Sequence, residues 1–102
     1  MIITQLIYVK KGAESIFHQF ETFAIPLITK YNGSLLLRLR PAAGEVIDAS
    51  IEPPYEVHLV EFPADQDLQS FMGDEERKKF LHLKEQSVRA AILIKGERIT
   101  GN

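Results

Sequence analysis

The stretch from Ile2 to Gly33, IITQLIYVKKGAESIFHQFETFAIPLITKYNG, decides the fold because its hydrophobic period changes in the middle. Residues 2–9 are apolar on both alternating sets, which is typical of a central strand that is covered on both sides. From Ala13 to Tyr31 the apolar residues fall at helical spacing on one stripe, and Pro26 predicts a kink or a break there. We expect Gly33 to end this helix in the left-handed conformation.

Two strands and a long loop follow the helix. Residues 34–40 alternate between apolar and polar, and residues 55–62 resume strand character. The loop between them, from Ala42 to Pro53, is longer than a hairpin needs. Because its apolar residues require burial, we interpret the loop as an arm that grips a partner, the alternative being a lid over a cavity. These residues are Val46, Ile47 and Ile51.

A second helical region and a last strand complete the order. Residues 63–88 are expected to form two helical pieces that Gly73 separates, with Asp74 capping the second piece. The last strand is expected from Ala90 to Ile99, with Gly96 as a candidate bulge.

The order strand, helix, strand, strand, helix, strand is that of the ferredoxin-like β-α-β-β-α-β fold, of the α+β class. We expect a single domain over residues 1–102, with a four-stranded antiparallel sheet and the helices on one face. The opposite face would expose a patch of roughly several hundred Å², more than monomers usually tolerate, so the sequence predicts a homodimer. The residues expected on that face are Leu6 or Ile7, Leu36, Val60, and Ile92 or Leu93.

The composition limits the classes of binding partner and the cellular compartment that we expect for this protein. The chain has 45% hydrophobic residues, a formal net charge of -2 and no cysteine. Its basic clusters are short, such as those at Lys10-Lys11 and Lys78-Lys79, so we expect no nucleic-acid partner. The longest apolar run, Ala90 to Ile94, is too short to span a bilayer, and residues 1–10 lack the layout of a signal peptide. We therefore expect a cytoplasmic protein with no membrane partner, disulfide or thiolate chemistry.

Several short motifs resemble domain-of-unknown-function family 1330, a branch of the dimeric α+β barrel superfamily. They are Pro26-Leu27-Ile28, Tyr31-Asn32-Gly33, the strand ending at Arg38, Val60-Glu61-Phe62 and Ile94-Lys95-Gly96. The resemblance spans nearly the whole chain and rests on mainly structural motifs. It implies that the sheets of two subunits pair into a barrel with an interior cavity.

Side-chain pairing predicts how the second and third strands align. Arg38 is expected opposite His58, because a slip by one residue would put His58 on the leucine face. This register leaves one apolar face for the helices and a second face with Arg38, His58, Arg40 and Glu56. The same register pairs Leu39 with Val57, Leu37 with Leu59, Leu36 with Val60, and Arg40 with Glu56.

In a paired barrel, the polar face would line the interior. Arg38 and His58 would then bind the carboxylate or enolate of a small ligand, with His58 as the catalytic group that moves a proton. The alternative is structural: Arg40 and Glu56 form a cross-strand ion pair, while Arg38 and His58 contact the partner subunit.

Glu61 and Tyr8 are two further candidates. Glu61 falls on the helix-facing side in this register and resembles a position where the family carries an acid, so a buried, catalytic carboxylate is one interpretation. The other is that Glu61 lies at the end of the strand and pairs with a lysine or with amide groups at the start of the next helix. Tyr8 and Tyr55 would place hydroxyl groups near the cavity mouth for ligand binding. Alternatively, their rings pack against other residues while their hydroxyl groups contact water.

Metal and cofactor motifs do not emerge from the sequence. His18, His58 and His82 do not fall at metal-ligand spacing with other donors, and the glycines and serines match neither phosphate-binding loops nor a nucleophile elbow. We predict no metal site and no cofactor.

The leading functional hypothesis is therefore a homodimeric barrel that binds an unknown small molecule. Its enzymatic form would be cofactor-free and would act on a small carbonyl, enolic or aromatic metabolite through Arg38 and His58. The alternative is a non-catalytic ligand-sensing or dimerisation module, and the sequence leaves both open.

Overall fold

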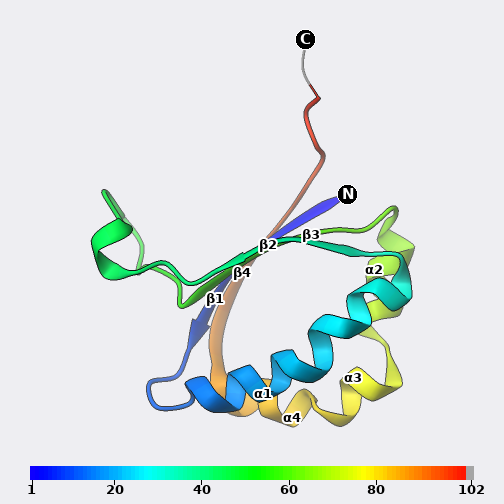
Figure 1. Cartoon of the computed structure of the whole chain (residues 1–102), viewed down its shortest axis with the longest axis horizontal. Helices are drawn as coiled ribbons and strands as arrows, with labels where there is room; N and C mark the ends of the chain where they lie inside the picture. The colour runs from blue at the N-terminus through cyan, green and yellow to red at the C-terminus, as the bar shows by residue number, and fades with distance from the viewer. Residues whose placement is uncertain (101–102) are drawn as a thin grey trace.

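The computed structural model describes residues 1–100, in which the α-helices cover one face of a four-stranded antiparallel sheet (Figure 1). The strand order is β2-β3-β1-β4, which is that of the ferredoxin-like fold, as predicted. The elements are β1 (Ile2–Val9), α1 (Glu14–Ala24), the 3-10 helix η1 (Ile25–Tyr31), β2 (Ser34–Leu39), the 3-10 turn η2 (Ala43–Glu45), β3 (Glu56–Glu61), α2 (Asp65–Met72), α3 (Glu75–Lys79), α4 (Leu81–Ser87) and β4 (Val88–Gly96). Within residues 1–100, no helix has the length and apolar character needed to cross a membrane.

Strand β1 lies inside the sheet and pairs with both β3 and β4. Its Ile3 and Ile7 are buried under the helices, and Ile3 packs in a core cluster with Ile28 of η1, Phe62 and Leu68 of α2. The break predicted at Pro26 is confirmed, because α1 ends at Ala24 and the chain continues as η1. The first 33 residues thus form the strand and helix that the change of period predicts.

The turn after η1 corrects one prediction about Gly33. Asn32, not Gly33, has the left-handed conformation, with a φ of 65°. Gly33 is instead needed for space: a Cβ atom there would lie 2.6 Å from Ile28 Cγ2 and 2.7 Å from Phe62 Cε1. The glycine therefore allows η1 to pack closely against the end of β3.

In the second helical region, Asp74 caps α3 as predicted, and its Oδ1 accepts a hydrogen bond from the backbone N–H of Arg77 at 3.0 Å. The prediction for the last strand was wrong in two respects. β4 begins at Val88 and ends at Gly96, and the irregularity in its pairing lies opposite Tyr8 and Val9 instead of at Gly96.

The predicted register of β2 and β3 is confirmed at Arg38 with His58, Leu37 with Leu59, and Leu39 with Val57. A bulge at Leu36 shifts the rest, so that Leu35 pairs with Val60, and the predicted pair of Leu36 with Val60 was wrong.

The prediction of which sheet face meets the helices was also wrong. His58, Glu56 and Val60 are buried beneath the helices, whereas Leu37 and Leu39 are 47% and 39% exposed on the other side. The reason lies in α1, which brings the carboxylate of Glu21 to the sheet, where it needs cationic partners.

We call the uncovered side of the sheet the open face. Each of its two central rows runs across all four strands, and Figure 1 shows no helix over them. The rows are Leu37, Leu59, Thr4 and Ile94, then Leu39, Val57, Leu6 and Ile92. An apolar face without a cover is therefore confirmed, although Ile7, Val60 and Leu93 do not belong to it.

Substitution of Gly33 by alanine is expected to lower the free energy of unfolding by about 1–3 kcal/mol, because the new methyl group would overlap Ile28 and Phe62. Urea unfolding followed by circular dichroism measures this change. Gly44→Ala is the matched control, because no atom lies within 4 Å of its added Cβ. Equal stability of the two variants would contradict the proposed close approach.

Candidate functional site

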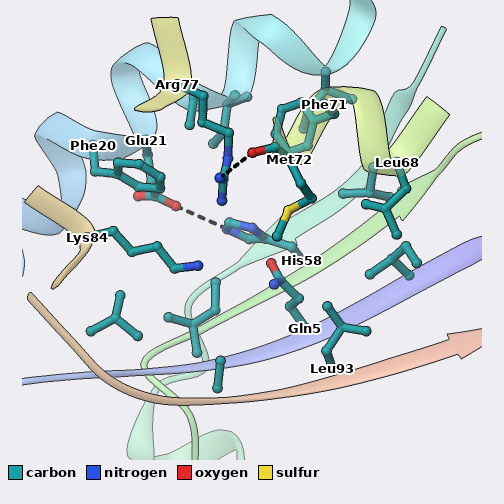
Figure 2. Close-up of a pocket in the computed structure, with 18 of the residues that line it drawn as sticks. Gln5, Phe20, Glu21, His58, Leu68, Phe71, Met72, Arg77, Lys84 and Leu93 are labelled. Atoms are coloured by element: carbon teal, nitrogen blue, oxygen red, sulfur yellow. Dashed lines mark hydrogen bonds and ion pairs between the residues drawn. The ribbon is translucent and has the colours of Figure 1, made fainter. Parts of the chain in front are cut away.

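A cavity of about 100 Å³ lies between the sheet and the helices (Figure 2). Most of its wall is apolar and aromatic, including Phe17, Phe20, Phe62, Leu68, Phe71 and Met72. Five polar side chains complete the wall: Gln5, Glu21, His58, Arg77 and Lys84. This combination of an apolar wall and a few polar groups is typical of small-molecule sites.

A buried network of charged groups joins α1 to β3 beside the cavity. His58 Nε2 lies 3.0 Å from Glu21 Oε2 and 2.7 Å from Glu56 Oε1. Arg38 donates from Nη2 to Glu21 Oε1 at 2.7 Å and from Nε to Glu56 Oε1 at 2.6 Å. Arg40 Nε donates to Glu56 Oε2 at 2.9 Å. The two carboxyl groups thus share an imidazole and two guanidinium groups, which offsets the cost of their burial.

The network shifts the pKa values of its members in different directions. Burial raises the pKa of Glu21, and the neighbouring Glu56 raises it further. Burial alone would also raise the pKa of Glu56, but hydrogen bonds with His58, Glu21, Arg38 and Arg40 lower it well below its usual range. Burial alone would lower the pKa of His58, but hydrogen bonds to both glutamates raise it above its ordinary value. Glu21 is therefore the carboxyl group that binds a proton first, and His58 favours its charged form.

The structure brings Arg38 and His58 together, but on the helix side of the sheet. His58 lines the cavity, whereas Arg38 lies outside it, in a shallow depression with Leu39, Arg40 and Glu56. The predicted ion pair of Arg40 with Glu56 is confirmed. Both Arg38 and His58 find their partners, Glu21 and Glu56, within the same chain.

Tyr8 and Glu61 lie away from this network. The hydroxyl of Tyr8 donates to the backbone oxygen of Glu52 at 2.7 Å. Glu61 pairs in the sheet with Ile2 and Ser34, and its carboxylate accepts from Arg98 at 3.3 Å. The prediction that Glu61 faces the helices was wrong, because His58, Val60 and Phe62 occupy that side of β3. The alternative position at the end of the strand is what the structure has, but the partner of Glu61 is Arg98 instead of a lysine or the amides of the next helix.

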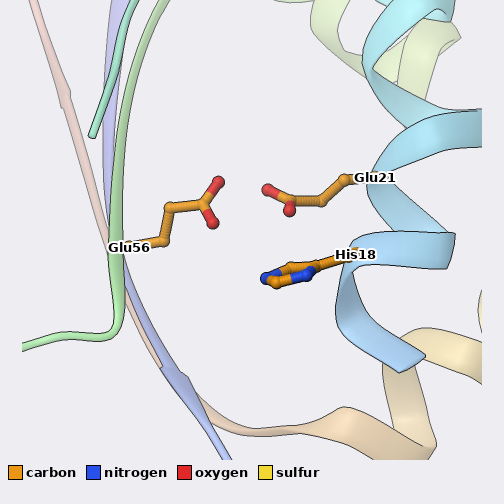
Figure 3. A group of neighbouring side chains, drawn as sticks. All are labelled: His18, Glu21 and Glu56. Atoms are coloured by element: carbon orange, nitrogen blue, oxygen red, sulfur yellow. The ribbon is translucent and has the colours of Figure 1, made fainter. Parts of the chain in front are cut away.

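Figure 3 shows a group of three side chains that takes Glu21 and Glu56 from the network and adds His18. One potential donor atom from each residue lies within 4.8 Å of the others, a spacing that suits a metal ion. The charges around it do not suit one, because Arg38 and Arg40 already neutralise the carboxylates and would repel a second cation. His18 Nε2 is also engaged, 2.6 Å from the hydroxyl of Tyr55.

Four polar residues of the site escaped the sequence analysis: Gln5, Glu21, Arg77 and Lys84. A signal for Glu21 was present, since it lies between Phe17 and Ala24 on the buried stripe of α1. Lys84 follows Lys78 and Lys79 in the sequence, and nothing in the local pattern separates it from them. Its place in the cavity wall follows from how α4 packs.

Comparisons with known proteins support the fold alone. No family model matches the chain and no curated protein does, so the resemblance to domain-of-unknown-function family 1330 stays a prediction. A solved protein of unknown function from Rhodopseudomonas palustris has a TM-score of 0.81 at 11% identity, over 98% of this chain and 82% of that one. A dimeric ferredoxin-like protein of unknown function from Jannaschia sp. CCS1 has a TM-score of 0.69 at 12% identity, over 95% and 97% of the two chains. A NIPSNAP family protein of unknown function from Agrobacterium tumefaciens has a TM-score of 0.65 at 17% identity, over 97% and 89%.

The network predicts how stability depends on pH. Because the folded-state pKa of His58 is above the unfolded value of about 6.5, its contribution is fully present below that pH. The contribution is lost as the pH rises through the folded pKa. We expect the free energy of unfolding to fall as the pH rises above 6.5, and His58→Gln to reduce this slope while costing roughly 1–3 kcal/mol at pH 6.

Urea unfolding at intervals across this pH range measures the slope. His82→Gln is the control, because His82 is exposed on α4. An unchanged slope in His58→Gln would show that the imidazole does not gain its proton on folding.

Proposed function

We propose that this protein is a homodimeric small-molecule-binding module that holds its ligand in the cavity between the sheet and the helices. The observation that carries the proposal is the cavity wall itself, in which aromatic side chains surround a few polar groups. The aromatic wall would bury the apolar part of a ligand, and the polar side chains would orient its polar end.

The homodimer is supported by the open face. A leucine or isoleucine that becomes fully buried there contributes about 1.5–3 kcal/mol, and a second copy presents the same apolar rows. The loop before β3 adds to this argument, because its Ile47 is 94% exposed and the loop itself extends away from the helices (Figure 1). The Jannaschia protein is described as dimeric with the same fold, in agreement with this proposal.

A charge on the open face is expected to separate the subunits. Leu39→Glu and Ile92→Glu would each place a carboxylate in the same apolar row, where pairing would bury it without a partner. Light scattering after size exclusion should find a dimer for the wild type and a monomer for both variants. Ile99→Glu is the control, because Ile99 is exposed beyond the end of β4. A wild-type monomer at tens of micromolar would refute the dimer.

Binding without catalysis is favoured by the saturation of the charged network. Glu21 and Glu56 are engaged by three basic side chains, which leaves neither as a free general base. The second candidate, a cofactor-free enzyme, is favoured by one feature: His58 lines the cavity and, among residues 1–100, forms its side-chain hydrogen bonds through Nε2 alone. Its Nδ1 would then be the atom that exchanges a proton with a ligand.

Neutral aromatic probes test whether the cavity takes a ligand. Toluene and benzyl alcohol are expected to raise the melting temperature of the wild type, because they fill space lined by phenylalanines. Ala24→Leu should abolish the shift by filling the cavity from α1, whereas Ala43→Leu in the exposed turn η2 should retain it. If neither probe shifts the wild type at millimolar concentration, or if Ala24→Leu retains the shift, the cavity is not a binding site.

A further inference from the structure

Two cationic side chains enter the cavity from the short helices α3 and α4. Arg77 is only 6% exposed, and its guanidinium lies 5.7 Å from the ring centre of Phe20 and 5.3 Å from that of Phe71. Its Nη1 donates to the backbone oxygen of Met72 at 3.3 Å. Its Nε is buried with no hydrogen-bond partner among residues 1–100. Arg77 thus has donor capacity that the described chain does not use.

Lys84 is the second cation, and Figure 2 shows its amino group directed into the same cavity, which His58 and Gln5 also line. Its side chain is partly buried. Burial lowers the pKa of Lys84, and the positive charge of Arg77 lowers it further. Two like charges therefore face one apolar cavity.

No carboxylate of residues 1–100 forms an ion pair with either cation. Glu21, the acid in the cavity wall, is engaged by His58 and Arg38. Asp74, the buried acid that caps α3, accepts hydrogen bonds from Lys30, Tyr31 and the backbone N–H of Arg77. Buried charges without a direct ion-pair partner are costly, and the charge of Asp74 acts on Arg77 only from a distance. An anion from outside the chain would offset this cost for both groups.

We propose that the cavity binds a small organic acid, with its carboxylate held between Arg77 and Lys84 and its apolar body against the phenylalanines. The proposal rests on the proposed function, since it names the class of ligand for the same cavity. A guanidinium fork and an ammonium group are the side chains that recognise carboxylates most strongly.

The size of the cavity sets the size of the ligand. Its volume of about 100 Å³ exceeds the minimum for one water molecule by roughly seven to ten times, which suits a body on the order of ten non-hydrogen atoms. An inorganic anion would satisfy the two cations but leave the aromatic wall without contacts. An aromatic or branched monocarboxylate satisfies both.

Benzoate and its neutral analogue benzyl alcohol share an aromatic ring and differ in charge. Comparing them separates the contribution of the carboxylate to binding from that of the ring. Titration calorimetry on the wild-type chain should show benzoate binding at least about tenfold more tightly than benzyl alcohol, and more tightly than inorganic phosphate. Lys84→Met should weaken benzoate binding by about tenfold and leave benzyl alcohol unchanged. Lys79→Met is the control, because Lys79 is exposed on α3 and should alter neither affinity.

Arg77 is tested by Arg77→Lys, which keeps a charge, alongside Arg77→Met. Both should weaken benzoate more than benzyl alcohol. If Arg77→Met does not fold, Arg77→Lys and Lys84→Met still test whether the two cations hold the carboxylate of benzoate. Equal binding of benzoate and benzyl alcohol in all variants would overturn the anion site but leave the small-molecule cavity standing. Tighter binding of phosphate than of benzoate would contradict the proposed contact between the apolar body of the ligand and the phenylalanines. The absence of binding by all three probes would refute both the organic-acid site and the small-molecule cavity.

Discussion

The pairing of Glu21 on α1 with His58 and Arg38 on the sheet is the interaction on which the rest of the structure depends. A glutamate on the buried stripe of a helix is tolerated only where cations meet it, and two strands supply them at 3.0 Å and 2.7 Å. The contact fixes the rotation of α1 over the sheet, because a turn of the helix would leave the carboxylate among phenylalanines. It also forms one end of the cavity, since Glu21 and His58 both belong to the cavity wall.

The same contact decides what the other side of the sheet presents. Once Arg38 and His58 point to the helices, alternation along β2 and β3 sends Leu37, Leu39 and Val57 to the opposite face. The polar network under the helices and the apolar rows on the open face thus both result from the orientation of β2 and β3, which turns Arg38 and His58 toward the helices. Ligand binding and subunit pairing would therefore use opposite faces of one sheet.

Local patterns were sufficient to predict the order of the elements, the break at Pro26, the cap at Asp74 and most of the register of β2 and β3. These features depend on residues close in sequence or on the pairing of two strands. The choice of face could not be predicted in the same way, because both faces of the strands carry apolar residues. It depends on Glu21, which meets its partners only in three dimensions. The positions of Arg77 and Lys84 likewise depend on the packing of two short helices, and the bulge at Leu36 has no local signal.

The order of the strands has a further consequence at the rims of the sheet. β4 is a nine-residue edge strand whose outer backbone groups have no neighbouring strand within residues 1–100. Arg89 and Lys95 lie along it and pair with Glu52 and Asp65. Charged side chains on an edge oppose the docking of a foreign strand, since it would bury them. Apolar residues in place of Arg89 and Lys95 would leave this edge open to pairing with strands of other chains, as in fibril growth. The two charged side chains therefore protect β4 against aggregation.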